Sequence, residues 1–423
     1  MTNGISENAL YVGLYLPGEE APTTAALLKL ERNNLQESGY LAYGLGYLER
    51  PVAQALNPLH LPLQRESFRL PARLLRDGGA LPLSIKDALP DAWGLRVLAH
   101  QLGGRLPGER EQLLLTNEDR VGAMVFSENR DMPPLTELPH HEYPQLGQLA
   151  DAVHRLQYDM EIPPPLKRLL LRGGSLGGAR PKASFTHEHA LWLAKFPAAG
   201  DPLDVQVLEA TALGLAMRCG IQVPQFMTMP IGRSETAFLS RRFDRFGENA
   251  RQRLHYLSAS ALLDIPYESS DGSYVEFTRV IRLLSMRPGA DLKELFRRMI
   301  FNLLIDNTDD HLKNHGMLCL GGDRYLLSPA FDVVPQLTNL GYQMLSIDGR
   351  TQESSLELAV QSAAHFDLSA DQASTIIKEM AGIVYGQWWL HAELQDVPDT
   401  LRKRLESCFG RQKEIIGAGK FGY

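Results

Sequence analysis

Residues 306–314 read DNTDDHLKN, and the interpretation of the whole chain starts from this segment. A predicted hairpin, Met317–Leu320 and Tyr325–Ser328, follows it and turns at Gly321-Gly322-Asp323. The hairpin leads into Pro329-Ala330-Phe331-Asp332. Asp309 and Asp332 are therefore expected at the two ends of one hairpin, where their side chains can approach each other.

The segment is preceded by a predicted core-facing helix. Asp291 and Glu294 have the spacing of a capping box, and the helix is expected to run from there to Asn307. The prediction rests on apolar residues at i, i+3, i+4, i+7 and i+11, namely Leu292, Leu295, Phe296, Met299 and Leu303.

An upstream region supplies a glycine run, a lysine and a glutamate. The run is Gly173-Gly174-Ser175-Leu176-Gly177-Gly178, and a short strand is expected at Lys182–Thr186. Period-two alternation predicts a second strand, Ala190–Phe196, with Lys195 on the face of Leu191 and Leu193. A helix is then expected from Asp204, its N-cap, to Arg218; it carries Glu209 and is closed by Gly220.

These parts match what phosphoryl transfer from a nucleotide requires, because that reaction depends on positioning and charge neutralisation. Glycines let backbone N–H groups approach phosphate. A lysine on a strand, oriented by a helix acid, holds phosphates, and this pair would be Lys195 with Glu209. Asp309 and Asn314 have the spacing of the base and the metal-ligating asparagine in the loop H-R-D-x-x-x-x-N. With Asp332 as a further oxygen ligand, the ordered set predicts ATP and Mg²⁺ as cofactors.

Each member also has a simpler reading. The glycine run can be a flexible turn, Lys195 can extend from an edge strand to solvent, and Glu209 can be a solvated helix carboxylate. The aspartates can cap or solvate turns. His311 and His315 could suggest zinc, but they lie in a predicted loop with no glutamate between them, which disfavours that reading. The joint occurrence in kinase order favours phosphotransfer.

The chain resembles the HipA family of serine/threonine kinases, the toxin halves of bacterial type II toxin–antitoxin pairs. The resemblance is carried by Ser175–Lys182, Leu193–Pro197, Arg241–Arg245, Asp306–Asn314 and Ala330–Asp332, and in the N-terminal part by Ala88–Gly94 and Asp119–Ala123. It implies a two-lobed, protein-kinase-like α+β fold with an N-terminal α+β accessory subdomain and a mostly helical C-terminal lobe.

The resemblance also implies roles for individual residues. Asp309 matches the catalytic base, Asn314 and Asp332 match the magnesium ligands, and Lys195 matches the phosphate-holding lysine. Other positions border the nucleotide. They are the ATP-covering loop of Gly177, Gly178, Ala179, Arg180 and Lys182, the adenine hinge at Arg241 and Phe243, and His311 with Lys313. Family members often carry glutamate at position 241, so Arg241 is expected to act through its backbone.

Ser175 matches the serine that family members autophosphorylate. About two added negative charges on a loop that holds a triphosphate should repel the nucleotide, so phosphorylation is expected to inactivate the enzyme. The resemblance further implies a HipB-like helix-turn-helix antitoxin, operator DNA bound indirectly through that antitoxin, and a protein substrate of the aminoacyl-tRNA synthetase class.

Composition limits the alternatives. The chain has 423 residues, 22% of them charged, and a formal net charge of −7, which argues against a whole-molecule nucleic-acid clamp. Its three cysteines have no paired spacing, so a reducing, cytoplasmic compartment is expected. No apolar run approaches the ~20 residues that span a bilayer, and no membrane partner is expected.

The predicted organisation has four parts: an accessory subdomain at 1–126, a proline-rich linker at 127–165 with one short helix near 145–157, an N-lobe at 166–256 and a C-lobe at 257–423. Trp388, Trp389 and Leu390 are expected in the core of the C-lobe. The six arginines of Arg233–Arg253 are expected mostly on a solvated face.

Two other functions remain open from sequence. One is a small-molecule phosphotransferase of the aminoglycoside-kinase type. The other is a catalytically silent scaffold for an antitoxin on DNA. Separately, Arg233–Arg253 or Arg402-Lys403-Arg404 could contact the DNA backbone when an antitoxin brings the complex to an operator, although a solvated face is the favoured reading.

Overall fold

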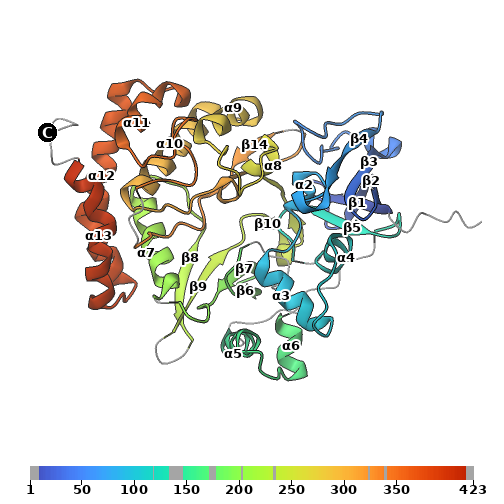
Figure 1. Cartoon of the computed structure of the whole chain (residues 1–423), viewed down its shortest axis with the longest axis horizontal. Coiled ribbons are helices and arrows are strands. Elements are labelled where there is room, and N and C mark those ends of the chain that lie inside the picture. Colours follow the sequence, from blue (N-terminus) through green and yellow to red (C-terminus); the bar gives the residue numbers. More distant parts are fainter. Residues whose placement is uncertain are drawn as a thin grey trace, which may run out of the picture. The chain divides into compact units, whose positions relative to one another are not determined.

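The structure is a computed structural model that describes residues 9–117, 119–132, 146–170, 178–201, 203–231, 235–322, 324–337 and 341–415 (Figure 1). The chain forms two compact units, each assembled from separate stretches of sequence. The first unit contains Met1–Leu193, Asp244–Leu257 and Leu318–Tyr325, and the second contains Ala194–Phe243, Ser258–Met317 and Leu326–Tyr423. The four-part division expected from the sequence stays a prediction.

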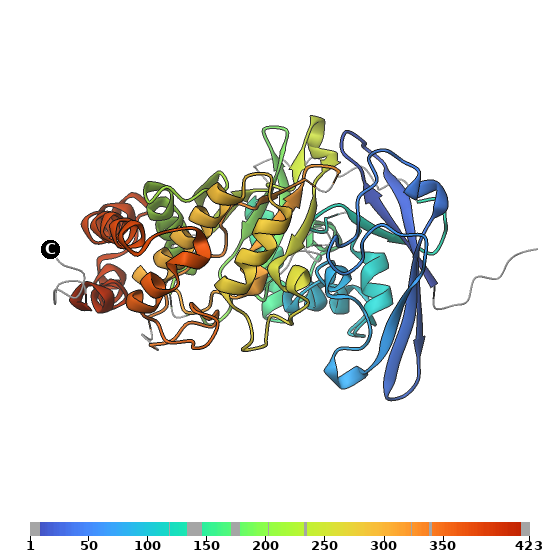
Figure 2. The same cartoon turned by 90° about the horizontal axis from the view of Figure 1, so that it is seen from above.

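The first unit is built on a five-stranded antiparallel sheet. Its order is β4-β3-β2-β1-β5, with β1 at Ala9–Tyr15, β2 at Pro22–Arg32, β3 at Gln36–Tyr43, β4 at Phe68–Leu74 and β5 at Met124–Ser127. Apolar side chains of β1, such as Val12 and Leu14, are fully buried, whereas Leu27 and Tyr40 of β2 and β3 are exposed. One face of the sheet therefore covers the core, and Figure 2 shows the helices of residues about 83–115 along that face.

Short helices complete the first unit. They are α1 (Leu45–Leu48), η1 (Leu75–Asp77), α2 (Leu83–Lys86), α3 (Ala92–Gln101), α4 (Glu109–Leu115), α5 (Leu146–Gln157) and α6 (Pro164–Leu170). The helix expected near 145–157 corresponds to α5, which buries Leu149, Val153 and Leu156 at helical spacing.

The next strands along the chain, β6 (Lys182–His187) and β7 (Ala190–Lys195), form a hairpin. Its two turn residues, Glu188 and His189, have φ of 49° and 60°, as a type I′ turn requires. The strand order of this sheet is β6-β7-β9-β8, with β8 at Phe226–Pro230 and β9 at Thr236–Arg241. Short pieces follow at β10 (Arg245–Phe246), η3 (Glu248–Ala250), β11 (Gln252–Arg253) and β12 (His255–Ser258).

The second unit is mostly helical. Its helices are α7 (Val205–Arg218), α8 (Ala259–Leu263), α9 (Tyr274–Leu284), α10 (Pro288–Leu304), η4 (Leu312–Asn314), α11 (Leu356–Gln361), η5 (Ala363–Phe366), α12 (Ala370–Leu394) and α13 (Asp399–Ile415). Helix α12 packs against both α7 and α10. Strand β13 (Gly316–Cys319) pairs between β12 and β14 (Tyr325–Leu327), which gives the hairpin expected after residue 314.

Several expected elements are confirmed and some details are wrong. Asp204 caps α7 by accepting from the backbone N–H of Val207, and Gly220 has a φ of 76°. The capping box at Asp291 is wrong: α10 begins at Pro288, and the Asp291 carboxylate instead accepts from Ser285, Arg287 and the backbone of Leu327. The helix also ends at Leu304 rather than Asn307.

Two burial predictions are also wrong. Trp389 and Leu390 on α12 are 39% and 52% exposed, so they lie outside the core. Three arginines of the supposed solvated face, Arg242, Arg245 and Arg253, are buried. Arg245 pairs with Asp244 at 2.6 Å, and Arg253 donates to the carbonyl of Asn117, so their charges are matched inside the protein. No helix among the described residues combines the length and apolar content that crossing a bilayer requires.

Candidate active site

Lys195, at the end of β7, lies at the centre of the site. Its Nζ donates to both carboxylate oxygens of Glu209, at 2.8 and 2.9 Å, and to Oδ1 of Asp332 at 2.8 Å. Burial alone would lower the pKa of Lys195, but the carboxylates of Asp332 and Glu209 outweigh it and raise the pKa. The lysine is therefore a charged, fixed cation and does not extend to solvent.

Glu209 reaches Lys195 because α7 is buried along almost its whole length. Its side chain is only 4% exposed. A buried carboxylate needs a cation or several hydrogen-bond donors close to it. Lys195 is a cation, and it also donates a hydrogen bond to each oxygen of Glu209. The reading of Glu209 as a solvated helix carboxylate is therefore wrong.

Asp332 enters the site from the chain after β14. Its φ of 59° is in the left-handed region, which reorients the chain directly after Phe331. Phe331 packs against Phe243, with ring centroids 5.6 Å apart. The Asp332 side chain is 47% exposed although it bonds Lys195, so it can be reached by a ligand from solvent.

The loop from Asp309 to His315 contains one turn of 3₁₀ helix, η4. Asp309 is exposed, whereas Asn314 is buried and its amide donates to the Asp309 carbonyl at 3.4 Å. The neighbouring Asp310 is also buried and bonds Tyr274 and His315. Burial alone would raise the pKa of Asp310, but His315 and the hydrogen bonds from His315 and Tyr274 lower it.

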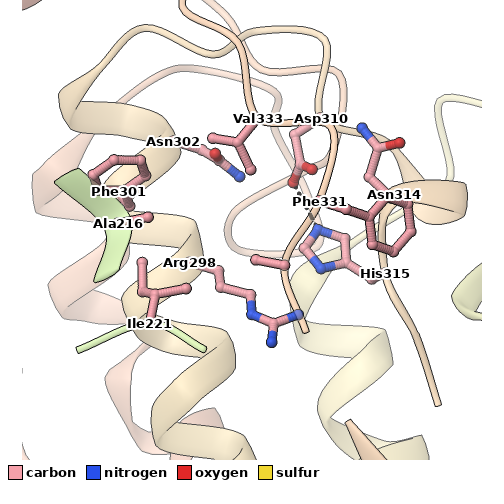
Figure 3. Close-up of a pocket in the computed structure, with 11 residues that line it drawn as sticks. Ala216, Ile221, Arg298, Phe301, Asn302, Asp310, Asn314, His315, Phe331 and Val333 are labelled. Atoms are coloured by element: carbon pink, nitrogen blue, oxygen red, sulfur yellow. Dashed lines mark hydrogen bonds and ion pairs between the residues drawn. The ribbon is translucent and has the colours of Figure 1, made fainter. Parts of the chain in front are cut away.

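A small cavity lies behind this loop (Figure 3). Asn314 lines it together with Phe331 and Val333, the two chain neighbours of Asp332. Its remaining lining residues are Ala216, Ile221, Arg298, Phe301, Asn302, Asp310, His315 and Ala330. Asn314 and the segment that carries Asp332 thus meet at one wall of this cavity.

The donor set fits Mg²⁺. Mg²⁺ prefers oxygen ligands and is usually bound by one or two carboxylates, with water and substrate phosphates filling the other positions. Asp332 and Asn314 offer one carboxylate and one amide oxygen from two segments that meet. Among the described residues there is no cluster of three or more His, Cys, Asp or Glu side chains suited to a metal, so the zinc reading of His311 and His315 has no further ligand there.

The expected ATP-covering loop lies in the first unit. Gly178 has a φ of 102°, a conformation that favours glycine, and its N–H donates to the carboxylate of Asp91. Lys182 is buried, and its carbonyl accepts from the indole of Trp93 at 2.9 Å. Arg180 is half-buried and Ala179 is exposed. Gly177 and Ser175 lie outside the described residues.

The remaining predicted positions are close to the catalytic loop or on the strand that leads to the hinge. His311 packs against Tyr267, with ring centroids 5.1 Å apart, and Lys313 places its Nζ 4.6 Å from the centroid of the same ring. Arg241, at the end of β9, is exposed, so its side chain has no buried role.

Four further residues contact the predicted site residues or their immediate neighbours, and the sequence analysis assigned none of them a role at the site: Asp91, Tyr267, Asp310 and His315. Asp310 and His315 were visible as neighbours of the predicted base and metal ligand, and their own spacing of five residues was the available signal. Tyr267 lies in an ordinary loop, and no local pattern marks it.

Comparison with known proteins gives the family. A model described as the HipA-like C-terminal domain matches residues 174–388, about half of the chain. The chain belongs to the HipA family. Every predicted site residue, from Ser175 to Asp332, falls within the matched HipA range.

A solved HipA structure supports the fold. HipA of Shewanella oneidensis MR-1, determined with HipB and operator DNA, is 16% identical and matches 96% of this chain and 97% of its own, with a TM-score of 0.71. This likeness confirms the predicted α+β, kinase-like fold class. The proinflammatory kinase CtkA of Helicobacter pylori is 14% identical and covers 55% of this chain and 94% of its own, with a TM-score of 0.36.

A curated relative is named "Putative kinase Y4dM" and comes from Sinorhizobium fredii (strain NBRC 101917 / NGR234). It is 24% identical over 207 residues, which is 45% of this HipA-family chain. The match spans 48% of that protein, about half of its length.

Proposed function

We propose that this HipA-family protein is an ATP- and Mg²⁺-dependent serine/threonine protein kinase of the cytoplasm and the toxin of a type II toxin–antitoxin pair. The observation that carries the proposal is the contact of Lys195 with both Glu209 and Asp332. A structural protein has no reason to bury a lysine between two carboxylates and leave one of them half exposed, because an apolar replacement is at least as stable.

The residues divide the work as follows. Lys195, held by Glu209, binds the α- and β-phosphates of ATP as a fixed cation. Asn314 and Asp332 hold Mg²⁺, which, when bound, neutralises charge on the phosphate oxygens. Asp309 is exposed on the same loop as Asn314, and it orients the acceptor hydroxyl and accepts its proton.

Nucleotide binding must also rearrange one contact. In this structure one carboxylate oxygen of Asp332 accepts a hydrogen bond from Lys195. Lys195 would exchange this contact for phosphate oxygens of the nucleotide, and the Asp332 carboxylate would then be available to hold Mg²⁺. Because Asp332 is 47% exposed, this exchange needs no opening of the core.

A phosphotransfer assay tests the proposal. Purified protein, Mg²⁺ and ATP labelled on the γ-phosphate are incubated with a cell extract and with aminoacyl-tRNA synthetases. Label should enter a protein band, and Asp309→Asn should reduce its incorporation by about 10²–10⁴-fold. Asp396→Asn is the matched control, because Asp396 is exposed and its φ of 54° suits asparagine equally well.

The same assay separates the alternatives. Label that enters only a small molecule supports a phosphotransferase of the aminoglycoside-kinase type. No label in any acceptor, with ATP still bound, supports a catalytically silent scaffold. Toxicity gives a second readout: Asp309→Asn expressed alone should permit growth where the wild type arrests it.

Partners and regulation complete the proposal. The Shewanella HipA was determined with HipB and operator DNA, which supports a HipB-like antitoxin that carries this protein to DNA. Autophosphorylation at Ser175 would place about two negative charges in the ATP-covering loop and weaken nucleotide binding. Ser175→Asp should therefore raise the Kd for ATP, and an unchanged Kd would contradict this regulation.

A further inference from the structure

A buried hydrogen bond closes the catalytic loop from behind. His315 Nε2 and Asp310 Oδ2 are 2.8 Å apart, and both side chains are almost fully buried. Each residue is the immediate successor of a site residue, since Asp310 follows Asp309 and His315 follows Asn314. The bond therefore joins the two ends of the loop that carries the base and the metal ligand.

The same carboxylate anchors the loop to the helices below it. Tyr274, the first residue of α9, donates its hydroxyl to Asp310 Oδ2. The Tyr274 oxygen accepts from the amide of Asn302 on α10 at 3.1 Å, and the Asn302 carbonyl oxygen accepts from Asn307 at 3.1 Å. The loop is thus tied to two core helices through one side chain, Asp310.

Backbone hydrogen bonds attach each end of the loop to a different neighbouring segment. Its start is fixed where Thr308 accepts from the backbone of Met344 at 3.1 Å, and its end where His315 accepts from the backbone of Ala259 at 2.8 Å. A further bond does join the two ends, because Asn314 Nδ2 donates to the Asp309 carbonyl, but at 3.4 Å it is longer than the 2.8 Å bond between Asp310 and His315.

The cavity on one side of the loop makes this connection matter. Asp310, Asn314 and His315 all line it, and Figure 3 shows the dashed bond between Asp310 and His315 at its wall. The cavity has room for about one water molecule, so side-chain packing is incomplete on this side of the loop. Hydrogen bonds then contribute to fixing the positions of Asp309 and Asn314, and the 2.8 Å bond between Asp310 and His315 is the shorter of the two side-chain bonds that join the loop's ends.

We propose that Asp310 and His315 are positioning residues, which hold Asp309 and Asn314 at the separation that phosphoryl transfer needs. The inference rests on the proposed kinase function. A displacement of about 1 Å can cost about 10²-fold in rate, so loss of the bond should lower kcat more than it changes substrate binding.

The test is a double-mutant cycle read in kcat, with every assay run at least 10 °C below the lowest Tm in the set. Asp310→Leu and His315→Leu should each lower kcat by about 10- to 100-fold. The double variant should lie close to Asp310→Leu, because that change already removes the bond to His315 as well as the one to Tyr274. KM for the acceptor should stay within about threefold, since neither side chain is exposed. The Mg²⁺ concentration for half-maximal rate should rise as Asn314 moves.

Two further variants separate positioning from stability. His315→Gln keeps an N–H donor toward Asp310 and should retain kcat within about threefold of the wild type. His255→Leu removes another buried histidine, which bonds the Leu56 carbonyl within the first unit, and should lower Tm while leaving kcat unchanged.

The outcomes distinguish the two proposals. Wild-type protein that labels no acceptor overturns the kinase function, and this inference with it. An active wild type with His315→Leu at full kcat overturns the inference alone, as does a double variant whose loss equals the product of the single losses.

Discussion

The Lys195 ion pairs predict that one substitution lowers both stability and activity, and that a second substitution restores the stability alone. Lys195→Met removes the cation from Glu209, whose side chain is 4% exposed and whose two oxygens both accept from Nζ. Leaving a buried charge without its partner costs about 3–5 kcal/mol. Compact units of about 150–250 residues lose about 2–4 °C per kcal/mol, so Tm should fall by about 6–20 °C.

A second substitution should restore the stability and leave the protein inactive. In Lys195→Met/Glu209→Leu the buried charge is gone, and an apolar pair of similar volume is about as stable as the ion pair. Most of the loss in Tm should therefore be recovered, while phosphate transfer stays undetectable, because no cation remains to hold the triphosphate.

Asp332→Asn is the matched control on the other side of the lysine. Its side chain is 47% exposed and Lys195 keeps Glu209, so this exchange should change stability by no more than about 1 kcal/mol. It should nevertheless abolish Mg²⁺-dependent transfer, since the carboxylate ligand is lost.

The measurements are thermal unfolding by circular dichroism and transfer of labelled phosphate, for the wild type and the three variants side by side. A Lys195→Met protein with wild-type Tm would show that the buried pair does not contribute as the geometry requires. A double variant that stays as unstable as Lys195→Met would show that side-chain volume, and not charge, explains the loss.

Three further predictions concern the first unit. Gly178→Ala should raise KM for ATP several-fold, because a φ of 102° strains any residue with a Cβ by about 1–3 kcal/mol and Lys182 Nζ would have to move away from the new Cβ. Steady-state kinetics measure KM, and an unchanged value would contradict this prediction. Arg120→Lys should lower Tm, because the buried guanidinium donates to three segments of chain that a single ammonium cannot reach together; calorimetry measures the effect. Burial lowers the pKa of His255 to about 4 from 6.5, so the unfolded chain takes up the proton first and stability is lost as pH falls from about 6.5 towards 4. Between pH 7 and 5 the wild type should lose about 2 kcal/mol more than His255→Gln in denaturant titrations, and equal losses would contradict the buried neutral histidine.

Local sequence patterns predict much of the candidate site. The five-residue interval from Asp309 to Asn314, the hairpin that leads to Asp332, and the strand and helix that carry Lys195 and Glu209 are all local patterns. Local patterns survive folding when hydrogen bonding and side-chain periodicity within one segment determine them. For this reason the start of β7 and the cap of α7 agree with expectation.

The errors have a common cause, which is that burial of a polar residue is decided by neighbours far away in sequence. Asp291 has capping-box spacing, but Arg287 and the distant backbone of Leu327 compete for its carboxylate. Arg245 and Arg253 look like solvated charges until the carbonyls of Gly122 and Asn117, more than 100 residues earlier, are placed beside them.

The chain's order of residues therefore fixed which groups could take part in the chemistry, because residue type and local spacing limit what a loop can present. Folding in three dimensions fixed the environment of each group: Lys195 is shared by two carboxylates that come from helix α7 and from the chain after β14, and Asp310 is the buried tie between the catalytic loop and two helices. Contacts of this kind join segments that have no pattern in common, so only the packed structure contains them.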